Sequence, residues 1–247
     1  VIAVGMAKAG LTANPSQLDH PKGYFSLFGV ADHPRADLAD RLRFWQDGWA
    51  QEWTLKRYPA CYGTHRAVDA IIELHEQIGS TAADFERIEV RVHPSALEPL
   101  ISHLPSTGLE GKFSMPYTMV RALTEGRLDL DAFTDDRVNG DGVLAMMQRV
   151  NVVTADAPQT RPDLAGAHFA EVAVTLPSGS RVERLVEISR GDARNPLTDA
   201  EVDAKFLACC AVAGWGSDEA GELLVRMRAL PKGGTLASLR EGLQRKA

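Results

Sequence analysis

The hydrophobic pattern of the first 54 residues indicates helices. Mostly apolar residues occupy positions 2–9, and Gly10 follows them as a residue that readily ends a helix because it tolerates a left-handed backbone. Residues 21–25 predict a loop. From 37 to 49, large apolar residues recur at helical spacing with charges between them, which predicts one buried helix face formed by Leu38, Leu42, Trp45 and Trp49.

The pattern changes after Trp53. Residues 55–64 (LKRYPACYGT) contain Pro59 and Gly63 and show no periodicity, so they predict a loop. Threonine often caps the start of a helix, and we expect Thr64 to cap the helix that follows this loop. The buried stripe of that helix is predicted to consist of Ala67, Val68, Ile71, Ile72 and Ile78.

Alternating segments further along the chain predict strands. Apolar and charged residues alternate from 88 to 92, which is typical of a half-buried strand. Residues 172–176 and 182–188 also alternate, and the turn sequence Pro177-Ser178-Gly179-Ser180 between them predicts a hairpin. Helices are expected around 114–124 and 142–149, followed by a candidate strand at 151–154. Antiparallel strands with helices on one face would form an α+β layer.

The last part of the chain returns to a helical pattern. Thr198 and Glu201 stand at the spacing of a capping box, in which the two side chains satisfy backbone amides at the start of a helix. We therefore predict a fold of the α+β class in three parts. Residues 1–54 are helical, 55–192 form the α+β part and 193–247 are helical again, with the two helical parts packed together.

Composition and charge narrow the classes of partner. Hydrophobic residues make up 45% of the 247 residues and charged residues 24%, as in an ordinary globular protein. A net charge of −6 argues against nucleic acid as a main partner. No apolar stretch has the length of a membrane helix, so no membrane partner is expected. Because the chain does not begin with Met, we expect its natural N-terminus to lie upstream.

Cysteine and histidine spacings give no support for disulfides or metals. Two of the three cysteines are neighbours, Cys209 and Cys210, so no disulfide framework is expected and a cytoplasmic location is predicted. His65 and His75 are ten positions apart, and neither an HExxH nor a CxxC motif occurs. The acidic residues between 129 and 141 lack the register of a calcium loop. We therefore expect neither a metal nor a cofactor.

Four segments together resemble the MmgE/PrpD family, in the same order and at similar separations. The resemblance extends over nearly all of the chain but begins partway through the family's fold. The segments are 55–70 (LKRYPACYGTHRAVDA), 111–117 (GKFSMPY) with its following helix through 127, 133–135 (FTD) and 191–206 (GDARNPLTDAEVDAKF).

The resemblance implies a two-domain enzyme. A large helical domain would be formed by an N-terminal half together with the C-terminal tail, with the smaller α+β lid domain of 55–192 inserted between them. It also implies a metal-free active site in the cleft between the domains. Family members eliminate water from small polycarboxylates, decarboxylate them or epimerise them, with 2-methylcitrate, cis-aconitate and iminodisuccinate as examples.

The resemblance also implies site residues. The lysine of the KxYP string and the tyrosine that ends FSxPY correspond to Lys56 and Tyr117, and the histidine of the TH pair corresponds to His65. We predict these three as catalytic, with Lys112 and Arg57 as further substrate-binding cations. An ammonium group can hold a carboxylate, and histidine or tyrosine can exchange protons with a substrate. We also predict that Lys56 and Tyr117 face one cleft.

Each of these residues also has a structural interpretation that the sequence leaves open. Lys56 and Arg57 can be a solvated basic pair, and Lys112 can simply be exposed. Tyr117 can be a packed tyrosine with a satisfied hydroxyl, and His65 a satisfied polar residue in the first turn of its helix.

The function that follows from the resemblance is a cofactor-free lyase. Its substrate would be a small di- or tricarboxylate, and its reaction that of a hydro-lyase of the 2-methylcitrate dehydratase type. The alternatives are a decarboxylase or epimerase of the same family, or a non-catalytic subunit that supplies a lid and a dimer surface. A cytoplasmic homodimer is expected.

Overall fold

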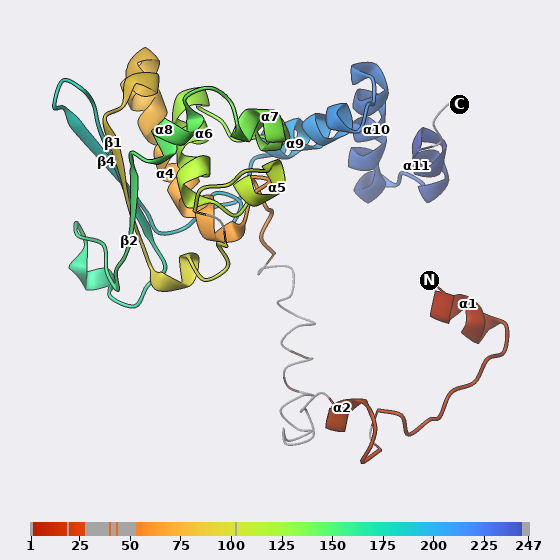
Figure 1. Ribbon diagram of the computed structural model, residues 1–247. Helices are drawn as coiled ribbons and strands as arrows, with labels where there is room; N and C mark the ends of the chain where they lie inside the picture. Colours follow the sequence, from red (N-terminus) through yellow and green to blue (C-terminus); the bar gives the residue numbers. More distant parts are fainter. Residues whose placement is uncertain are drawn as a thin grey trace. The chain divides into compact units, whose positions relative to one another are not determined.

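The computed structural model describes residues 2–18, 20–27, 40, 43, 53–101 and 103–243, without the side chains of 80, 81, 238, 241 and 242. The chain divides into two compact units, Val1–Trp53 and Thr54–Ala247 (Figure 1). Of the predicted helix at 37–49, only residues 40 and 43 are described, and both are helical.

The first unit begins with the predicted helix. This helix, α1, spans Ile2–Lys8, and Gly10 beyond it has a φ of +91°, as expected for a glycine that ends a helix. The prediction of a loop at 21–25 is only partly correct, because a single helical turn, α2, forms at Tyr24–Leu27. Gly23 precedes this turn where a Cβ atom would lie 2.3 Å from the Gln17 carbonyl oxygen, so only glycine allows the chain to pass.

A four-stranded sheet organises the second unit, with the strand order β2-β1-β3-β4. The β1–β3 and β3–β4 pairs are antiparallel, but β1 and β2 are parallel, which corrects the expectation of antiparallel strands alone. A long helical connection between β1 and β2 allows both strands to run in one direction. The strands are β1 Arg87–Val92, β2 Val150–Thr154, β3 Ala170–Thr175 and β4 Arg181–Val186.

The predicted hairpin is the β3–β4 pair. Its turn is closed by the amide of Leu176, which donates to the Ser180 carbonyl at 2.8 Å. β3 is buried on both faces, which the alternation of its residues did not predict. On the second face, the Glu171 carboxylate accepts hydrogen bonds from the amides of Gln159 and Thr160 at 2.8 and 2.9 Å, so the segment after β2 covers the strand there.

Helices α4 and α6 cover the other face of the sheet (Figure 1). α4 spans His65–Ile78 and buries the predicted stripe except for Ile78, which is only partly buried, and α6 spans Met115–Glu125. The sheet residues that face them include Val90 and Val172, which pair across β1 and β3 and are fully buried. Three shorter helices connect these elements: α5 Gly108–Gly111, α7 Asp135–Val138 and α8 Val143–Met147.

The two main helices begin in different ways. Ser114 accepts a hydrogen bond from the amide of Tyr117 at 3.2 Å and so caps α6. Thr64 precedes α4 as predicted, but its hydroxyl makes no cap and instead donates to the Cys61 carbonyl at 2.9 Å. The reason is the 3-10 turn at Tyr62–Thr64, which leads directly into α4 and holds Thr64 in a helical conformation.

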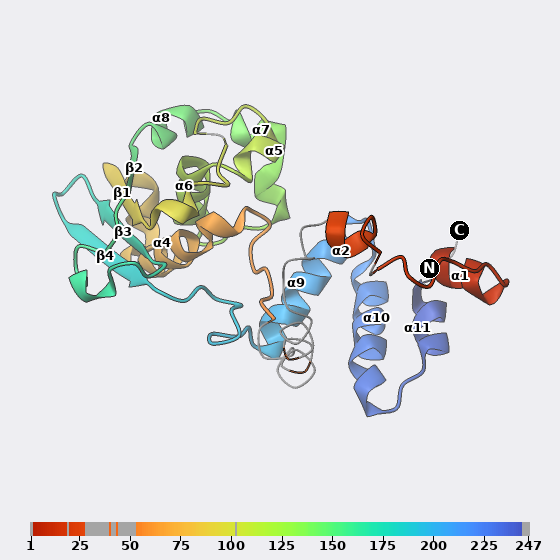
Figure 2. The ribbon, with the colours of Figure 1, turned by 90° about the horizontal axis from the view of Figure 1, so that it is seen from below.

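The tail of the second unit is helical, as predicted. The capping box is present at its start, where the Thr198 amide donates to Glu201 Oε2 at 2.8 Å and the Glu201 amide to Thr198 Oγ1 at 3.3 Å. α9 packs against α10, and α10 against α11 (Figure 2). The packing of this tail with residues 1–54 stays a prediction. The helices are α9 Asp199–Val212, α10 Ser217–Ala229 and α11 Leu236–Leu243.

The loop before α4 is held at three points. The Leu55 amide donates to the Gly191 carbonyl at 2.8 Å, Lys205 Nζ on α9 donates to the Arg57 carbonyl at 3.1 Å, and the Cys61 amide donates to the Lys112 carbonyl at 2.7 Å. Three segments that carried the family resemblance therefore meet around this loop.

Gly191→Ala should release the loop. Gly191 has a φ of +94°, and a Cβ atom there would lie 2.2 Å from the Leu55 carbonyl oxygen. We expect a loss of about 1 kcal/mol or more in unfolding free energy beyond that of Gly179→Ala, together with faster trypsin cleavage after Lys56. Gly179 is the matched control, because it also has a positive φ but no atom within 4 Å of the added Cβ. Equal effects of the two substitutions, measured by urea unfolding, would contradict the contact.

Candidate active site

Lys56 and Arg57 are neighbours in the loop but differ in their environment. Lys56 is exposed, and no carboxylate among the described residues pairs with it. Arg57 is half-buried, lies 5.2 Å from the Tyr58 ring centroid, and has nitrogen atoms 3.7 Å from carboxylate oxygens of Asp69 and Glu201. Arg57 is therefore already neutralised within the protein, whereas the Lys56 ammonium is available to an anion.

A buried carboxylate, Asp69 on α4, organises the surroundings of Arg57. The Tyr58 hydroxyl donates to Asp69 Oδ1 at 2.7 Å, and the Arg190 amide donates to Oδ2 at 2.7 Å. Burial raises the pKa of Asp69, and the two hydrogen bonds oppose that shift. The same burial and the neighbouring Asp69 charge raise the pKa of Tyr58. Sequence reasoning missed this cluster, because Arg190 is 121 positions from Asp69 and no local pattern shows that the two meet.

His65 is fully buried at the start of α4. Its ring lies between Tyr58 and Tyr62, with centroid distances of 5.2 and 4.9 Å. Nε2 lies 3.3 Å from the Ala60 carbonyl oxygen, which assigns the proton to Nε2. Nδ1 is buried and has no hydrogen-bond partner among the described residues.

Burial lowers the pKa of His65 to about 4. The positive charges of Lys56 and Lys205 act in the same direction, while the hydrogen bond to Ala60 opposes it. His65 is therefore neutral near pH 7 and is enclosed by aromatic side chains. This arrangement fits a structural support of the loop better than a group that exchanges protons with a substrate, and the catalytic role stays a prediction.

Tyr117 is also fully buried. Its hydroxyl donates to the Ala132 carbonyl and accepts a hydrogen bond from Arg121 Nε at 3.3 Å. Burial raises the pKa of Tyr117. On the other side of the ring, a Cβ atom at Gly111 would lie 3.0 Å from the ring carbons. The structure places Tyr117 as a packed tyrosine whose hydroxyl is satisfied by protein groups.

Lys112 is half-buried near Tyr117. Its ammonium lies 5.9 Å from the Phe133 ring centroid, and the Phe133 ring lies 6.0 Å from that of Tyr117. The structure thus brings Lys112, Phe133 and Tyr117 together, and separately places Lys56, Arg57 and His65 around one loop. Lys56 is exposed and Tyr117 fully buried, so the two side chains do not face one cleft in this conformation.

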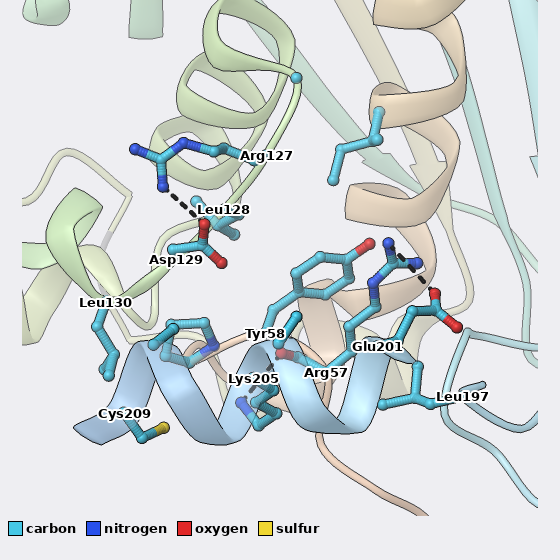
Figure 3. A pocket seen from close by; sticks show the side chains of 15 residues that line it. Arg57, Tyr58, Arg127, Leu128, Asp129, Leu130, Leu197, Glu201, Lys205 and Cys209 are labelled. Carbon is cyan, nitrogen blue, oxygen red and sulfur yellow. Dashed lines mark hydrogen bonds and ion pairs between the residues drawn. The ribbon is translucent and has the colours of Figure 1, made fainter. Parts of the chain in front are cut away.

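A cavity of about 250 Å³ lies beside Arg57 and Tyr58 (Figure 3). Its walls come from the loop before α4, the segment 126–130 after α6, and α9. None of Lys56, His65, Lys112 and Tyr117 lines it. No sequence pattern predicted this cavity, because the residues of α9 form no strong apolar face and Lys205 resembles any other helix lysine.

No cluster of three or more potential metal-ligating side chains occurs in the described part of the chain. Over the same residues, no helix has both the length and the apolar character needed to cross a membrane.

The second unit is an α+β domain with a helical tail, and comparison with known proteins identifies its family. Residues 58–227 match the MmgE/PrpD C-terminal domain. The chain therefore belongs to the MmgE/PrpD family, which confirms the resemblance found in its motifs.

Three curated relatives are similar to the chain. Cis-aconitate decarboxylase of Mus musculus is 23% identical over 215 residues, covering 83% of this chain and 42% of that protein. The Homo sapiens cis-aconitate decarboxylase is 23% identical over 214 residues, with the same two shares. The 2-methylcitrate dehydratase of Escherichia coli O157:H7 is 26% identical over 195 residues, covering 70% of this chain and 39% of that protein. The chain thus spans about two fifths of the length of these relatives.

The lowered pKa of His65 predicts a pH dependence of stability. An unfolded histidine has a pKa near 6.5. The unfolded state therefore binds a proton at a higher pH than the folded state, in which His65 becomes protonated only near pH 4. Stability should therefore be lost as the pH falls from about 6.5 to about 4, by up to roughly 3 kcal/mol.

His65→Gln should remove this component. The difference in unfolding free energy between the wild type and the variant is measured by urea unfolding. It should be largest at pH 8 and should shrink as the pH falls through this window. His103→Gln is the control in the same unit, because the His103 side chain is exposed. A difference between wild type and His65→Gln that stays constant from pH 8 to pH 4 would contradict the assignment.

Tyr117→Phe tests the packing role of the hydroxyl. The variant leaves the buried Ala132 carbonyl and Arg121 Nε without their partner, so we expect a loss of about 1–3 kcal/mol in unfolding free energy. Tyr62→Phe is the comparison, and should cost less because water can reach the half-buried Tyr62. A Tyr117→Phe variant as stable as the wild type would contradict a packing role for the hydroxyl.

Proposed function

We propose that this chain forms the lid and tail part of a lyase acting on small di- or tricarboxylates. The proposed reaction is that of a hydro-lyase of the 2-methylcitrate dehydratase type, without a cofactor. The observation that carries the proposal is membership of the MmgE/PrpD family, whose relatives here are a dehydratase and two decarboxylases named for such acids.

Lys56 is the residue best suited to contact the substrate. Its ammonium is exposed, and no carboxylate among the described residues neutralises it. The hydrogen bonds of Leu55 and Arg57 hold the backbone on either side of it. A fixed cation lowers the cost of orienting a carboxylate, and it stabilises the negative charge that develops when a proton leaves the neighbouring carbon.

The remaining predicted residues are assigned supporting roles. His65 packs against Tyr58 and Tyr62 under the loop, and Tyr117 connects α6 to the Ala132 carbonyl. Arg57 is engaged by Asp69 and Glu201. Lys112 keeps its ammonium near Phe133 and is a second candidate for contact with an anion. The elimination also needs a base and an acid, which we assign to parts of the enzyme other than these buried groups.

A decarboxylase is the second candidate. It is favoured by the cis-aconitate decarboxylases of mouse and human, which cover 83% of this chain. Both reactions need a cation beside a carboxylate, and they differ in whether water or carbon dioxide leaves. An epimerase, and a non-catalytic subunit that supplies a lid, are the further alternatives. The cytoplasmic homodimer stays a prediction.

The purified protein should be incubated with 2-methylcitrate and with cis-aconitate, and its products followed by NMR. Loss of water from 2-methylcitrate would support the hydro-lyase, and release of carbon dioxide from cis-aconitate the decarboxylase. If the protein neither converts nor binds any polycarboxylate, the proposal is contradicted.

Lys56→Met should raise KM by about tenfold or more, because a charged hydrogen bond to the substrate is lost. Lys232→Met is the control, since Lys232 is an exposed lysine at the end of the turn after α10. Kinetics of Lys56→Met equal to those of the wild type would rule out the proposed contact.

A further inference from the structure

The cavity beside Arg57 has an interior suited to a small apolar group. Ile72 from α4, Leu128 from the segment after α6, and Leu197 contribute large aliphatic side chains, and Ala204 and Ala208 form its wall on α9. At about 30 Å³ for each water-sized group, a volume of about 250 Å³ holds roughly eight such groups. This space fits a compact molecule with a short hydrocarbon chain.

The charged side chains of the cavity are paired, with one exception. Arg57 is engaged by Asp69 and Glu201, at 3.7 Å from each. Arg127 forms ion pairs of 2.6 Å with both Asp129 and Asp131. These last three side chains are about half exposed, so water screens the charge at this rim.

Lys205 is the exception. It is half-buried in α9, and the Arg57 carbonyl is the one partner found for its ammonium among the described residues. An ammonium has three N–H donors, so two remain for a ligand. Figure 3 shows this side chain in the cavity below the Tyr58 ring. A single cation beside an apolar wall matches one carboxylate with a hydrocarbon tail.

We infer that this cavity binds a small monocarboxylate with a short apolar tail, its carboxylate on Lys205 and its tail against Ile72, Leu128 and Leu197. A polycarboxylate fits less well, because its further charges would meet the aliphatic wall or approach Asp129 and Glu201. The site is thus separate from the proposed substrate contact at Lys56, and it does not depend on the proposed function.

Cys209 provides a direct readout of occupancy. It is exposed and lines the cavity one helical turn beyond Lys205, whereas Cys61 does not line it. The rate at which iodoacetamide labels each cysteine, followed by peptide mass spectrometry, reports occupancy at Cys209 and provides Cys61 as an internal control.

Hexanoate is the probe, because it has a single carboxylate and eight non-hydrogen atoms. It should slow labelling of Cys209 several-fold at millimolar concentrations without slowing labelling of Cys61. Hexanol, which lacks the charge, and tricarballylate, which carries three, should protect at least tenfold less well. Equal or better protection by either compound, or no protection by hexanoate, would overturn the inference.

Two variants test the assigned contacts. Lys205→Met should raise the hexanoate concentration needed for half protection about tenfold or more, whereas Lys232→Met should leave it unchanged. Ala208→Leu keeps Lys205 and fills the cavity from an exposed helix position, so it should also abolish protection. Wild-type protection in both Lys205→Met and Ala208→Leu, with circular dichroism unchanged, would show that hexanoate binds elsewhere.

Discussion

The buried carboxylate of Asp69 is the constraint on which the arrangement of the second unit depends. A charge on the inner side of α4 has to be satisfied by groups from other parts of the chain, because an unpaired buried carboxylate is costly. Tyr58 and Arg57 from the loop and the Arg190 amide from beyond β4 fulfil that need. Arg190 also pairs with Glu201, so the same cluster reaches α9. Asp69 thereby connects the loop with the segment after β4, and Arg57 and Arg190 extend the cluster to the helical tail.

The elements of this fold could be predicted where one local pattern decides the structure. The buried stripe of α4, the β3–β4 hairpin and the Thr198 capping box are examples. The parallel direction of β2 could not be predicted, because alternation shows that a strand exists but not which strand lies beside it. The burial of both faces of β3 depends on Glu171 and the segment after β2, a contact between residues distant in sequence.

The candidate site was predictable in part for the same reason. The motif containing Lys56 predicted a loop, but it did not predict that the Cys61 amide reaches the Lys112 carbonyl. Motifs cannot distinguish a residue that touches a ligand from one that supports the residue that does. Tyr117 has the environment of a supporting residue, whereas Lys56 has an accessible charge. Lys205 also belongs to a motif segment, but its proposed role depends on a cavity that forms only when the chain folds.

Synthesis of the chain produces β1 long before its partners. β1 lies between β2 and β3 in the sheet, yet about 80 residues separate its end at Val92 from the start of β3 at Ala170. At about 5–20 residues per second, the ribosome needs on the order of 4–16 s to make that stretch. During this time β1 presents Ile88, Val90 and Val92 while the edge that pairs with β3 stays unpaired, the kind of edge to which other chains add. α4 is made first and can cover these side chains, so early contact between α4 and β1 would protect the nascent chain from aggregation.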